Sequence, residues 1–312
     1  MRSIQFCFKY LENIGSWLVL LIAILVLTGC GPQIGNLRKS DGSEVKKTEF
    51  TVMTFNIRHG CGIKQWGNTS GGFFRGCKKH LEDLAATINS VPSEVVGLRE
   101  VNDGQAKALA KMTNMNYTYS SHNPGGYAGS WGNAILSKFK ILDSDLIRVG
   151  SHTPAKNRSI VSATMKVNSR NIVFISVHTH DKLYTSYSVR RIMAYIDSLS
   201  GPVVLIGDFN MRPNDDRWVE EIKKTPADYE RDNEEPRVSN RIFVDTAEEV
   251  DTPSAKEARF EGTWAAPYNS KRIDYILVEE KYSKVLDAGL VPLKYRKSSD
   301  HFAYYSVIRA KY

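Results

Sequence analysis

Residues 202–210 read Pro202-Val203-Val204-Leu205-Ile206-Gly207-Asp208-Phe209-Asn210, and their unbroken apolar run is typical of a strand buried on both faces of a sheet. Asp208 and Asn210 are two residues apart beyond that run, so we expect both side chains to leave on one face, with Gly207 letting the backbone turn. An acid beside an amide can align a water molecule and hold a phosphoryl oxygen, although an aspartate that only caps a turn would look the same. The stretch predicts a buried strand with a polar site at its end.

Apolar periodicity predicts strands and helices in a mixed order around this strand. Further strands are predicted at 50–57, 95–98, 117–120, 133–137, 141–148, 159–167, 172–179, 273–278, 285–291 and 302–308. Helices are predicted at 78–89, 103–112, 186–199 and 215–224, whereas the polar residues 226–260 allow no assignment. Strands with helices inserted at two places suggest an α/β protein with two facing sheets and helices outside. No internal linker is found, so residues 50–312 should form one domain.

The amino-terminal residues predict export. Trp17–Leu27 is an apolar run of eleven residues, too short for a helix that spans a bilayer core, which needs about 20. It ends in Leu27-Thr28-Gly29-Cys30, which resembles the bacterial lipoprotein box, in which the cysteine is lipidated and becomes the mature terminus. We therefore expect a signal peptide at 1–29, a lipidated tether at 30–49 and a membrane-anchored protein of the bacterial cell envelope that faces the periplasm or the exterior. An uncleaved anchor or a plain secretion signal is the alternative.

Cysteine usage agrees with export. Cys7 would leave with the signal peptide and Cys30 would carry lipid, which leaves Cys61 and Cys77. A lone pair of cysteines in an oxidising compartment favours a disulfide. Two buried free thiols are the alternative, and the irregular spacing of nearby histidines makes a zinc site improbable.

Composition is that of an ordinary globular protein, with 42% hydrophobic and 24% charged residues, and it excludes a disordered or repetitive chain. The formal net charge of +8 favours an anionic partner. Two basic clusters stand beside polar motifs, although a solvated lysine-rich loop would account for the second; they are Lys271 with Arg272, and Lys294 with Arg296 and Lys297.

Further short polar signatures stand at the ends of apolar runs. They are Thr54-Phe55-Asn56, Leu98-Arg99-Glu100, His178-Thr179-His180, Arg272-Ile273-Asp274-Tyr275 and Ser299-Asp300-His301. Carboxylates, amides and histidines delivered by strand ends are what a divalent-metal site that cleaves phosphodiesters requires. Together with Gly207-Asp208-Phe209-Asn210, this ordered series resembles the endonuclease/exonuclease/phosphatase superfamily along nearly all of the chain after residue 50. The resemblance implies a four-layer sandwich of two facing mixed β-sheets flanked by helices.

The expected proton chemistry centres on two histidines. His301 is predicted to take a proton from water, and the resemblance implies that Asp274 orients its imidazole. Asp208 and Asn210 would align the attacking water. His180 matches the catalytic histidine of the family and would bind the phosphate and protonate the leaving oxygen.

The expected cation is Mg²⁺, with Mn²⁺ possible, because Glu100, Asn56 and Asp300 offer hard oxygen ligands. The resemblance implies that Glu100 is the principal metal ligand and that Asn56 lies beside it. Arg99 departs from the glutamine usual at that position. It would either contact a phosphate or form an ion pair at a sheet edge.

Three further residues are expected to bind substrate. Arg158 matches an arginine often seen in relatives, and Asn133 lies on a strand that resembles one entering the family's site. His178 stands where asparagine is common, and a structural role fits it equally well. A structural salt bridge is the alternative for Arg158.

These residues predict a Mg²⁺-dependent phosphoester hydrolase at the cell envelope. The favoured activity is that of a phosphodiesterase or nuclease. The alternatives are a phospholipid or sphingomyelin phosphodiesterase and an inositol phosphate phosphatase. Its partners would be the phosphoester substrate and, through the lipid anchor, a membrane. No protein partner is inferred, and we expect a monomer. A catalytically inactive surface binding protein is the alternative of another class. Such a protein should lack one or more of the ionisable residues expected at the site, but this sequence contains all of them.

Overall fold

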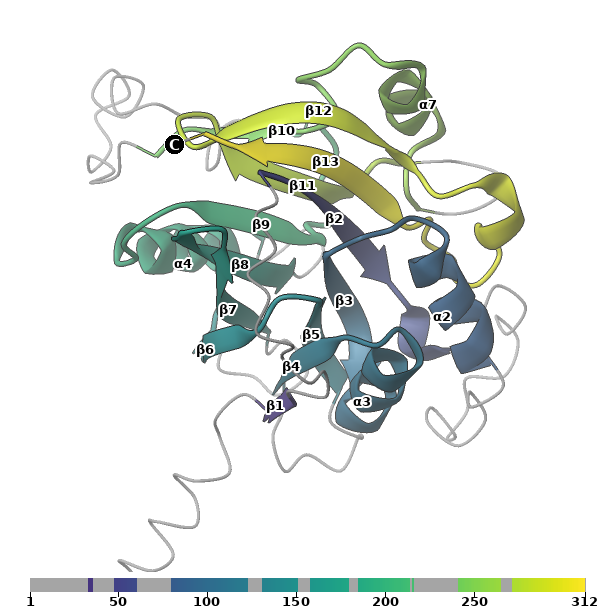
Figure 1. Ribbon diagram of the computed structural model, residues 1–312, viewed down its shortest axis with the longest axis horizontal. Helices are drawn as coiled ribbons and strands as arrows, with labels where there is room; N and C mark the ends of the chain where they lie inside the picture. Colours follow the sequence, from purple (N-terminus) through teal and green to yellow (C-terminus); the bar gives the residue numbers. More distant parts are fainter. Residues whose placement is uncertain are drawn as a thin grey trace, which may run out of the picture. The chain divides into compact units, whose positions relative to one another are not determined.

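A computed structural model describes residues 33–35, 48–60, 80–122, 131–150, 158–179, 185–213, 215, 241–264 and 271–311 (Figure 1). All of these residues belong to one structural unit, Pro32–Tyr312. The predicted signal peptide, Cys30, Cys61 and Cys77 lie outside the described residues. Within the described part, no helix has the length and apolar character needed to cross a membrane.

The described elements are mostly strands, with helices inserted between some of them. The strands are β1 (Gln33–Gly35), β2 (Glu49–Asn56), β3 (Val95–Asn102), β4 (Asn116–Ser121), β5 (Trp131–Ser137), β6 (Ile141–Arg148), β7 (Ser159–Val167), β8 (Arg170–His178), β9 (Val203–Asp208), β10 (Phe243–Asp245), β11 (Asp274–Glu279), β12 (Ser283–Leu290) and β13 (Tyr304–Ala310). The α-helices are α2 (Leu81–Asn89), α3 (Asp103–Met112), α4 (Thr185–Asp197) and α7 (Pro253–Glu261). Two short 3-10 helices complete them, η1 (Arg58–Gly60) and η5 (Leu293–Tyr295).

The strands form two mixed sheets. The seven-stranded sheet has the order β1-β4-β5-β3-β2-β13-β12, and the six-stranded sheet has the order β10-β11-β9-β8-β7-β6. Each sheet contains one parallel pair, β2 with β3 and β8 with β9. The strands of each pair are parallel because a helix, α2 or α4, carries the chain back to the end of the sheet at which the first strand began. The carboxyl ends of these parallel strands are where ligands bind in α/β proteins.

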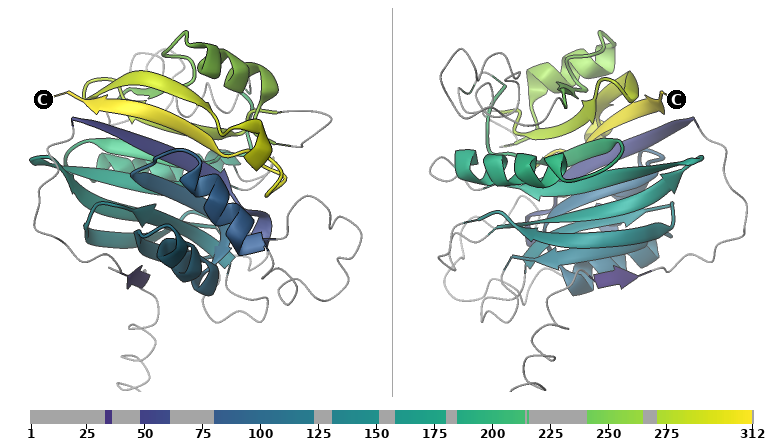
Figure 2. Two further views of the ribbon diagram at one scale, coloured as in Figure 1. Left: turned by 45° about the vertical axis from the view of Figure 1, so that its right-hand side comes forward. Right: turned by 90° about the vertical axis from the view of Figure 1, so that its left-hand side faces the viewer.

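Three apolar clusters hold the layers together. One lies between the sheets and includes Phe50 of β2 and Phe174 of β8, whose ring centroids are 5.9 Å apart. A second packs α2 and α3 on the seven-stranded sheet, and a third packs α4 on the six-stranded sheet. Figure 2 shows the two sheets face to face with these helices outside them. The predicted four-layer α/β sandwich is confirmed.

Local sequence signals explain where several elements begin. α3 begins at its predicted residue because Asn102 and Gln105 form a capping box, in which each side chain accepts the other residue's backbone N–H. β6 and β7 also have their predicted bounds, and the turn at Asn168-Ser169 joins β7 to β8 as an antiparallel hairpin, as expected.

Other elements differ from the prediction. β10 lies inside 226–260, for which no assignment was possible, and α7 begins there and ends one residue beyond it. β1 lies inside the expected tether and pairs antiparallel with β4. Gly207 lies within β9 rather than in a turn. A Cβ there would come within 2.5 Å of the Val177 carbonyl oxygen, so the glycine permits close strand packing. Of the predicted helix 215–224, only residue 215 is described.

Candidate active site

Both sheets deliver polar residues to one place. Asn56 ends β2 and Asp208 ends β9, and in the six-stranded sheet Asp208 stands opposite His178 on one side and Asp274 on the other. His301 comes from the loop before β13 of the other sheet. Ser299 Oγ ties that loop to the end of β2 by donating to the Asn56 carbonyl oxygen at 2.8 Å.

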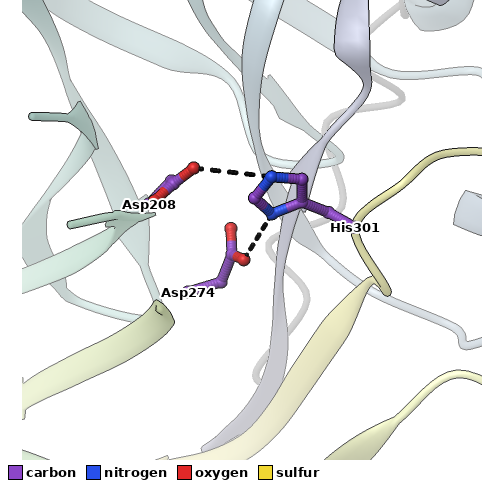
Figure 3. A group of neighbouring side chains, drawn as sticks. All are labelled: Asp208, Asp274 and His301. Carbon is purple, nitrogen blue, oxygen red and sulfur yellow. Dashed lines mark hydrogen bonds and ion pairs between the residues drawn. The ribbon is translucent and has the colours of Figure 1, made fainter. Parts of the chain in front are cut away.

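Asp208, Asp274 and His301 form a buried group (Figure 3). His301 Nδ1 lies 2.7 Å from Asp274 Oδ2, and His301 Nε2 lies 3.7 Å from Asp208 Oδ2. A carboxylate on Nδ1 holds the proton there, so that in the neutral ring Nε2 is the nitrogen that can accept a proton. The structure thus brings together three residues that the sequence placed at separate strand ends.

The carboxylates around His301 shift its pKa upward. Burial alone would lower the pKa of His301, but Asp274, through its charge and hydrogen bond, and then Asp208 and Asp300 outweigh burial and raise it to about 9. Burial and the Asp274 charge raise the pKa of Asp208. The pKa of Asp274 is lowered, because His301 and Arg99 outweigh the effect of its burial.

Arg99 is the buried counter-ion of Asp274. Its side chain is 0% exposed; Nη2 lies 2.9 Å from Asp274 Oδ1, and Nη1 donates to the Gly97 carbonyl oxygen at 2.6 Å. Both oxygens of Asp274 are therefore engaged, one by Arg99 and one by His301. For Arg99, a phosphate contact and an ion pair at a sheet edge were the expected alternatives. The observed contact is neither, because it is an ion pair across the interior between the sheets.

A β-bulge turns Glu100 toward the site. The register of β3 with β5 shifts between Arg99 and Val101, and Glu100 between them has a φ of 52°. Leu98 and Val101 both pack in the cluster on the helix side, so Glu100 is the extra residue. The bulge explains how the adjacent residues Arg99 and Glu100 both reach the site.

Glu100 lies among polar groups at the mouth of the site. Asn56 Nδ2 lies 3.3 Å from Glu100 Oε1 and 3.1 Å from Asp208 Oδ2, and Asn56 Oδ1 accepts from the Arg58 backbone N–H at 3.0 Å. Asn56, expected as a metal ligand, thus bridges two carboxylates through its amide nitrogen. The third expected ligand, Asp300, has Oδ2 at 3.4 Å from Arg58 Nε.

Asn210 holds Asp208 rather than standing beside it on a strand. β9 ends at Asp208, and Asn210 has a φ of 52°, so the strand alternation on which the expected shared face rested does not reach Asn210. Its backbone N–H donates to Asp208 Oδ1 at 2.9 Å, and its Nδ2 donates to the Thr179 carbonyl oxygen at 3.0 Å. His180, the next residue after Thr179, lies outside the described residues.

Two of the three expected substrate-binding residues, Arg158 and His178, lie against Trp131. The Arg158 guanidinium lies over the Trp131 ring at 4.9 Å, and the His178 ring is 5.8 Å from it, with His178 Nε2 at 3.8 Å from Asp208 Oδ2. Asn133 is fully buried and donates to the Ser159 carbonyl oxygen at 2.6 Å. Burial, followed by the Arg158 charge, lowers the pKa of His178 well below its usual range, so the ring is neutral at pH 7.

Sequence reasoning missed His59 and His122. His59 Nε2 lies 3.2 Å from Glu100 Oε2, and the His122 ring is 4.6 Å from Trp131. His122 Nδ1 accepts the Ser159 backbone N–H at 2.9 Å, so its proton sits on Nε2. No local pattern marked either residue as part of a site, because their partners lie far away in the sequence.

In the described part, one group of three ionisable side chains has its ligand atoms close enough together to hold a cation directly, and two further carboxylates are more accessible. Asp208, Asp274 and His301 offer ligand atoms within 4.8 Å of one another, but Arg99 and His301 already engage Asp274. Glu100 and Asp300 are 23% and 15% exposed, respectively, and can accommodate an ion that keeps several waters. The chemistry of these donors fits a divalent cation at the more exposed carboxylates, Glu100 and Asp300, and His301 is the buried group that can accept a proton.

Comparisons with known proteins agree with this fold. The sequence model of the Endonuclease/Exonuclease/phosphatase family matches residues 53–301. No curated protein sequence matches the chain. A Bacteroides vulgatus endonuclease/exonuclease/phosphatase is similar in structure, with a TM-score of 0.61, 19% identity, and 85% of this chain and 100% of that chain covered.

Two further structures carry more specific descriptions. The human Nocturnin catalytic domain with a bound sulfate has a TM-score of 0.61 at 15% identity, over 90% of this chain and 98% of that chain. A Bacteroides thetaiotaomicron mannosyl-6-phosphatase has a TM-score of 0.59 at 17% identity, over 84% of this chain and 100% of that chain. At such identities the likeness supports the fold.

Proposed function

We propose that this chain, which belongs to the Endonuclease/Exonuclease/phosphatase family, hydrolyses phosphoester bonds with the help of a divalent cation. The observation that carries the proposal is the Asp274, His301 and Asp208 arrangement, in which a carboxylate fixes the imidazole and a second carboxylate faces its free nitrogen. That arrangement is suited to activating water.

The reaction follows from the positions of these groups. A water molecule hydrogen-bonded to both His301 Nε2 and Asp208 Oδ2 gives its proton to Nε2, while its oxygen attacks phosphorus in line with the leaving oxygen. The phosphorus–oxygen ester bond breaks, and the leaving oxygen takes a proton, a role we propose for His180. A divalent cation, held by Glu100 and Asp300, would neutralise charge on the phosphate, and both Mg²⁺ and Mn²⁺ suit these oxygen ligands.

Positive charge near the site supports an anionic substrate. Lys271 Nζ lies 5.1 Å from the centre of the Trp264 ring, which is 6.4 Å from the His301 ring. We propose a phosphodiester substrate. Nucleic acid is the preferred candidate, and a lipid or inositol headgroup is the second. The Bacteroides mannosyl-6-phosphatase makes a sugar phosphate the further candidate to test.

We also propose that the protein acts at the bacterial cell envelope, anchored through Cys30. The apolar run and the Leu27-Thr28-Gly29-Cys30 box support this address. Labelling of the protein by radioactive palmitate in cells, abolished in Cys30→Ser, is the expected result. Unlabelled wild-type protein released into the soluble fraction would contradict it.

The test of the proposed function is a turnover panel with DNA, sphingomyelin, inositol phosphates and a sugar phosphate, with Mg²⁺ or Mn²⁺ and with a chelator. Hydrolysis of at least one substrate that the chelator stops, and that His301→Gln abolishes, is expected. Tight binding of a ligand without any turnover would favour the alternative of an inactive surface binding protein.

A further inference from the structure

His59 stands beside the expected metal ligand Glu100 and has no part in the reaction as proposed. Its Nε2 lies 3.2 Å from Glu100 Oε2, and the two side chains are 16% and 23% exposed. They are therefore open enough for an ion to enter, unlike the buried group formed by Asp208, Asp274 and His301. His59 is therefore a candidate for a role at the site, next to Glu100.

The backbone holds His59 in an unusual conformation. Arg58 and His59 are consecutive residues with φ values of 46° and 55°, a region that residues with side chains seldom adopt. The Gln105 side chain at the start of α3 donates to the His59 carbonyl oxygen at 2.6 Å. The Trp131 ring packs edge to face against the imidazole at 5.3 Å. Strain held by such contacts is common at functional sites.

The spacing of the two side chains fits chelation. Two ligand atoms that are each about 2.1 Å from a metal ion, at tetrahedral or right angles to one another, lie roughly 3.0–3.4 Å apart. The observed 3.2 Å between His59 Nε2 and Glu100 Oε2 falls in this interval. A plain hydrogen bond between the same atoms has a similar length, so an experiment must distinguish the two.

The donor set then decides which ion the site prefers. Mg²⁺ takes oxygen ligands and keeps several waters, whereas an imidazole suits Fe²⁺, Ni²⁺, Cu²⁺ and Zn²⁺, and Mn²⁺ stands at the weak end of this transition-metal series. An imidazole nitrogen directly beside a carboxylate oxygen therefore favours a transition-metal ion over Mg²⁺.

We propose that His59 Nε2 is a ligand of the catalytic cation, next to Glu100, and that the site selects a divalent transition metal, with Mn²⁺ as its probe, over Mg²⁺. The inference rests on the proposed metal-dependent function and adds a nitrogen ligand to it. It specifies a property of this chain that the oxygen ligands alone would not confer.

The test is electron spin echo spectroscopy of Mn²⁺ bound to the full-length chain, which detects a directly coordinated imidazole nitrogen without any turnover. The matched variants are His59→Gln and His80→Gln; His80 is an exposed histidine at the start of α2. We expect nitrogen coupling in the wild type and in His80→Gln, and none in His59→Gln. In titrations, His59→Gln should lose about tenfold or more in Mn²⁺ affinity and less than about threefold in Mg²⁺ affinity.

The outcomes separate this inference from the proposed function. Bound Mn²⁺ without nitrogen coupling in the wild type would overturn the inference and leave metal-dependent hydrolysis standing. Equal losses of Mn²⁺ and Mg²⁺ affinity in His59→Gln would overturn the selectivity. Failure of any divalent cation to bind would overturn both proposals.

Discussion

Arg99 and Asp274, residues of different sheets, form an ion pair with 2.9 Å between Nη2 and Oδ1 in the interior of the sandwich. The same aspartate holds His301 with its other oxygen. The groups that are to activate water are thus fastened to the contact between the sheets, and the stability of the fold and the geometry of the site depend on the same atoms.

Replacing Arg99 should destabilise the protein strongly. Arg99→Gln leaves the buried Asp274 carboxylate with His301 as its remaining partner in the site, and removal of one partner of a buried pair costs about 3–5 kcal/mol. The free energy of unfolding in urea measures the change. Arg309→Gln is the control, because Arg309 is 47% exposed and its pair with Glu49 should contribute less than about 1 kcal/mol. Equal losses in the two variants would contradict the role of the buried pair.

Removing the Asp274 charge should reduce turnover more than substrate binding. In Asp274→Asn the amide no longer requires the proton on His301 Nδ1, and loss of the correct tautomer lowers kcat by about 10⁴-fold in a comparable histidine and aspartate pair. We expect a fall of kcat of about 10³-fold or more with KM changed by less than about threefold. Steady-state kinetics on a substrate from the turnover panel measures both. A variant with kcat within tenfold of the wild type would show that Asp274 does not orient the base.

The stability that Asp274 provides should depend on pH. Its pKa in the folded protein is lowered below the ordinary value of 3.8, because His301 and Arg99 outweigh burial. A carboxyl with a depressed folded pKa stabilises the fold at pH values above its unfolded pKa, and this stabilisation disappears as the pH falls through the folded pKa. The difference in unfolding free energy between wild type and Asp274→Asn should be largest at neutral pH and shrink below about pH 4. An unchanged difference at pH 3 would contradict the lowered pKa.

Turnover should rise with pH through the neutral range. His301 must be neutral to accept a proton, and its pKa is raised to about 9. The logarithm of kcat/KM should therefore increase by about one per pH unit from pH 7 and level off near pH 9. The profile is measured at saturating divalent cation. A rate independent of pH between 6 and 9 would exclude His301 as the proton acceptor.

Local patterns were enough to predict most of the fold. α3, β6 and β7 were predicted from their apolar periodicity, and the structure gives them the predicted bounds. α7 was missed although Thr252 and Pro253 carry a start signal, an N-cap followed by proline at the first turn. The polar surroundings of residues 226–260 concealed that signal.

The sequence predicted which residues form the site better than it predicted which of them contact one another. The sequence placed Asp208, Asp274 and His301 at strand ends, but it could not reveal that Arg99 pairs with a residue 175 positions away. The bulge at Glu100 could not be predicted, because the position holds a glutamate and not the glycine that would have signalled a left-handed backbone. His59 and His122 join the site through Glu100, Trp131 and Ser159, and such contacts exist only after the sheets have met.

Because the backbone at Glu100 is left-handed, selection for stability and selection for activity favour different residues at this position. A glycine would adopt this conformation without the steric cost that a side chain bears, which is on the order of 1–3 kcal/mol. A laboratory screen for heat resistance alone would therefore tend to replace Glu100, whereas a screen for turnover would retain it. Variants of this protein chosen for durability should be checked at this position before they are used as active enzymes.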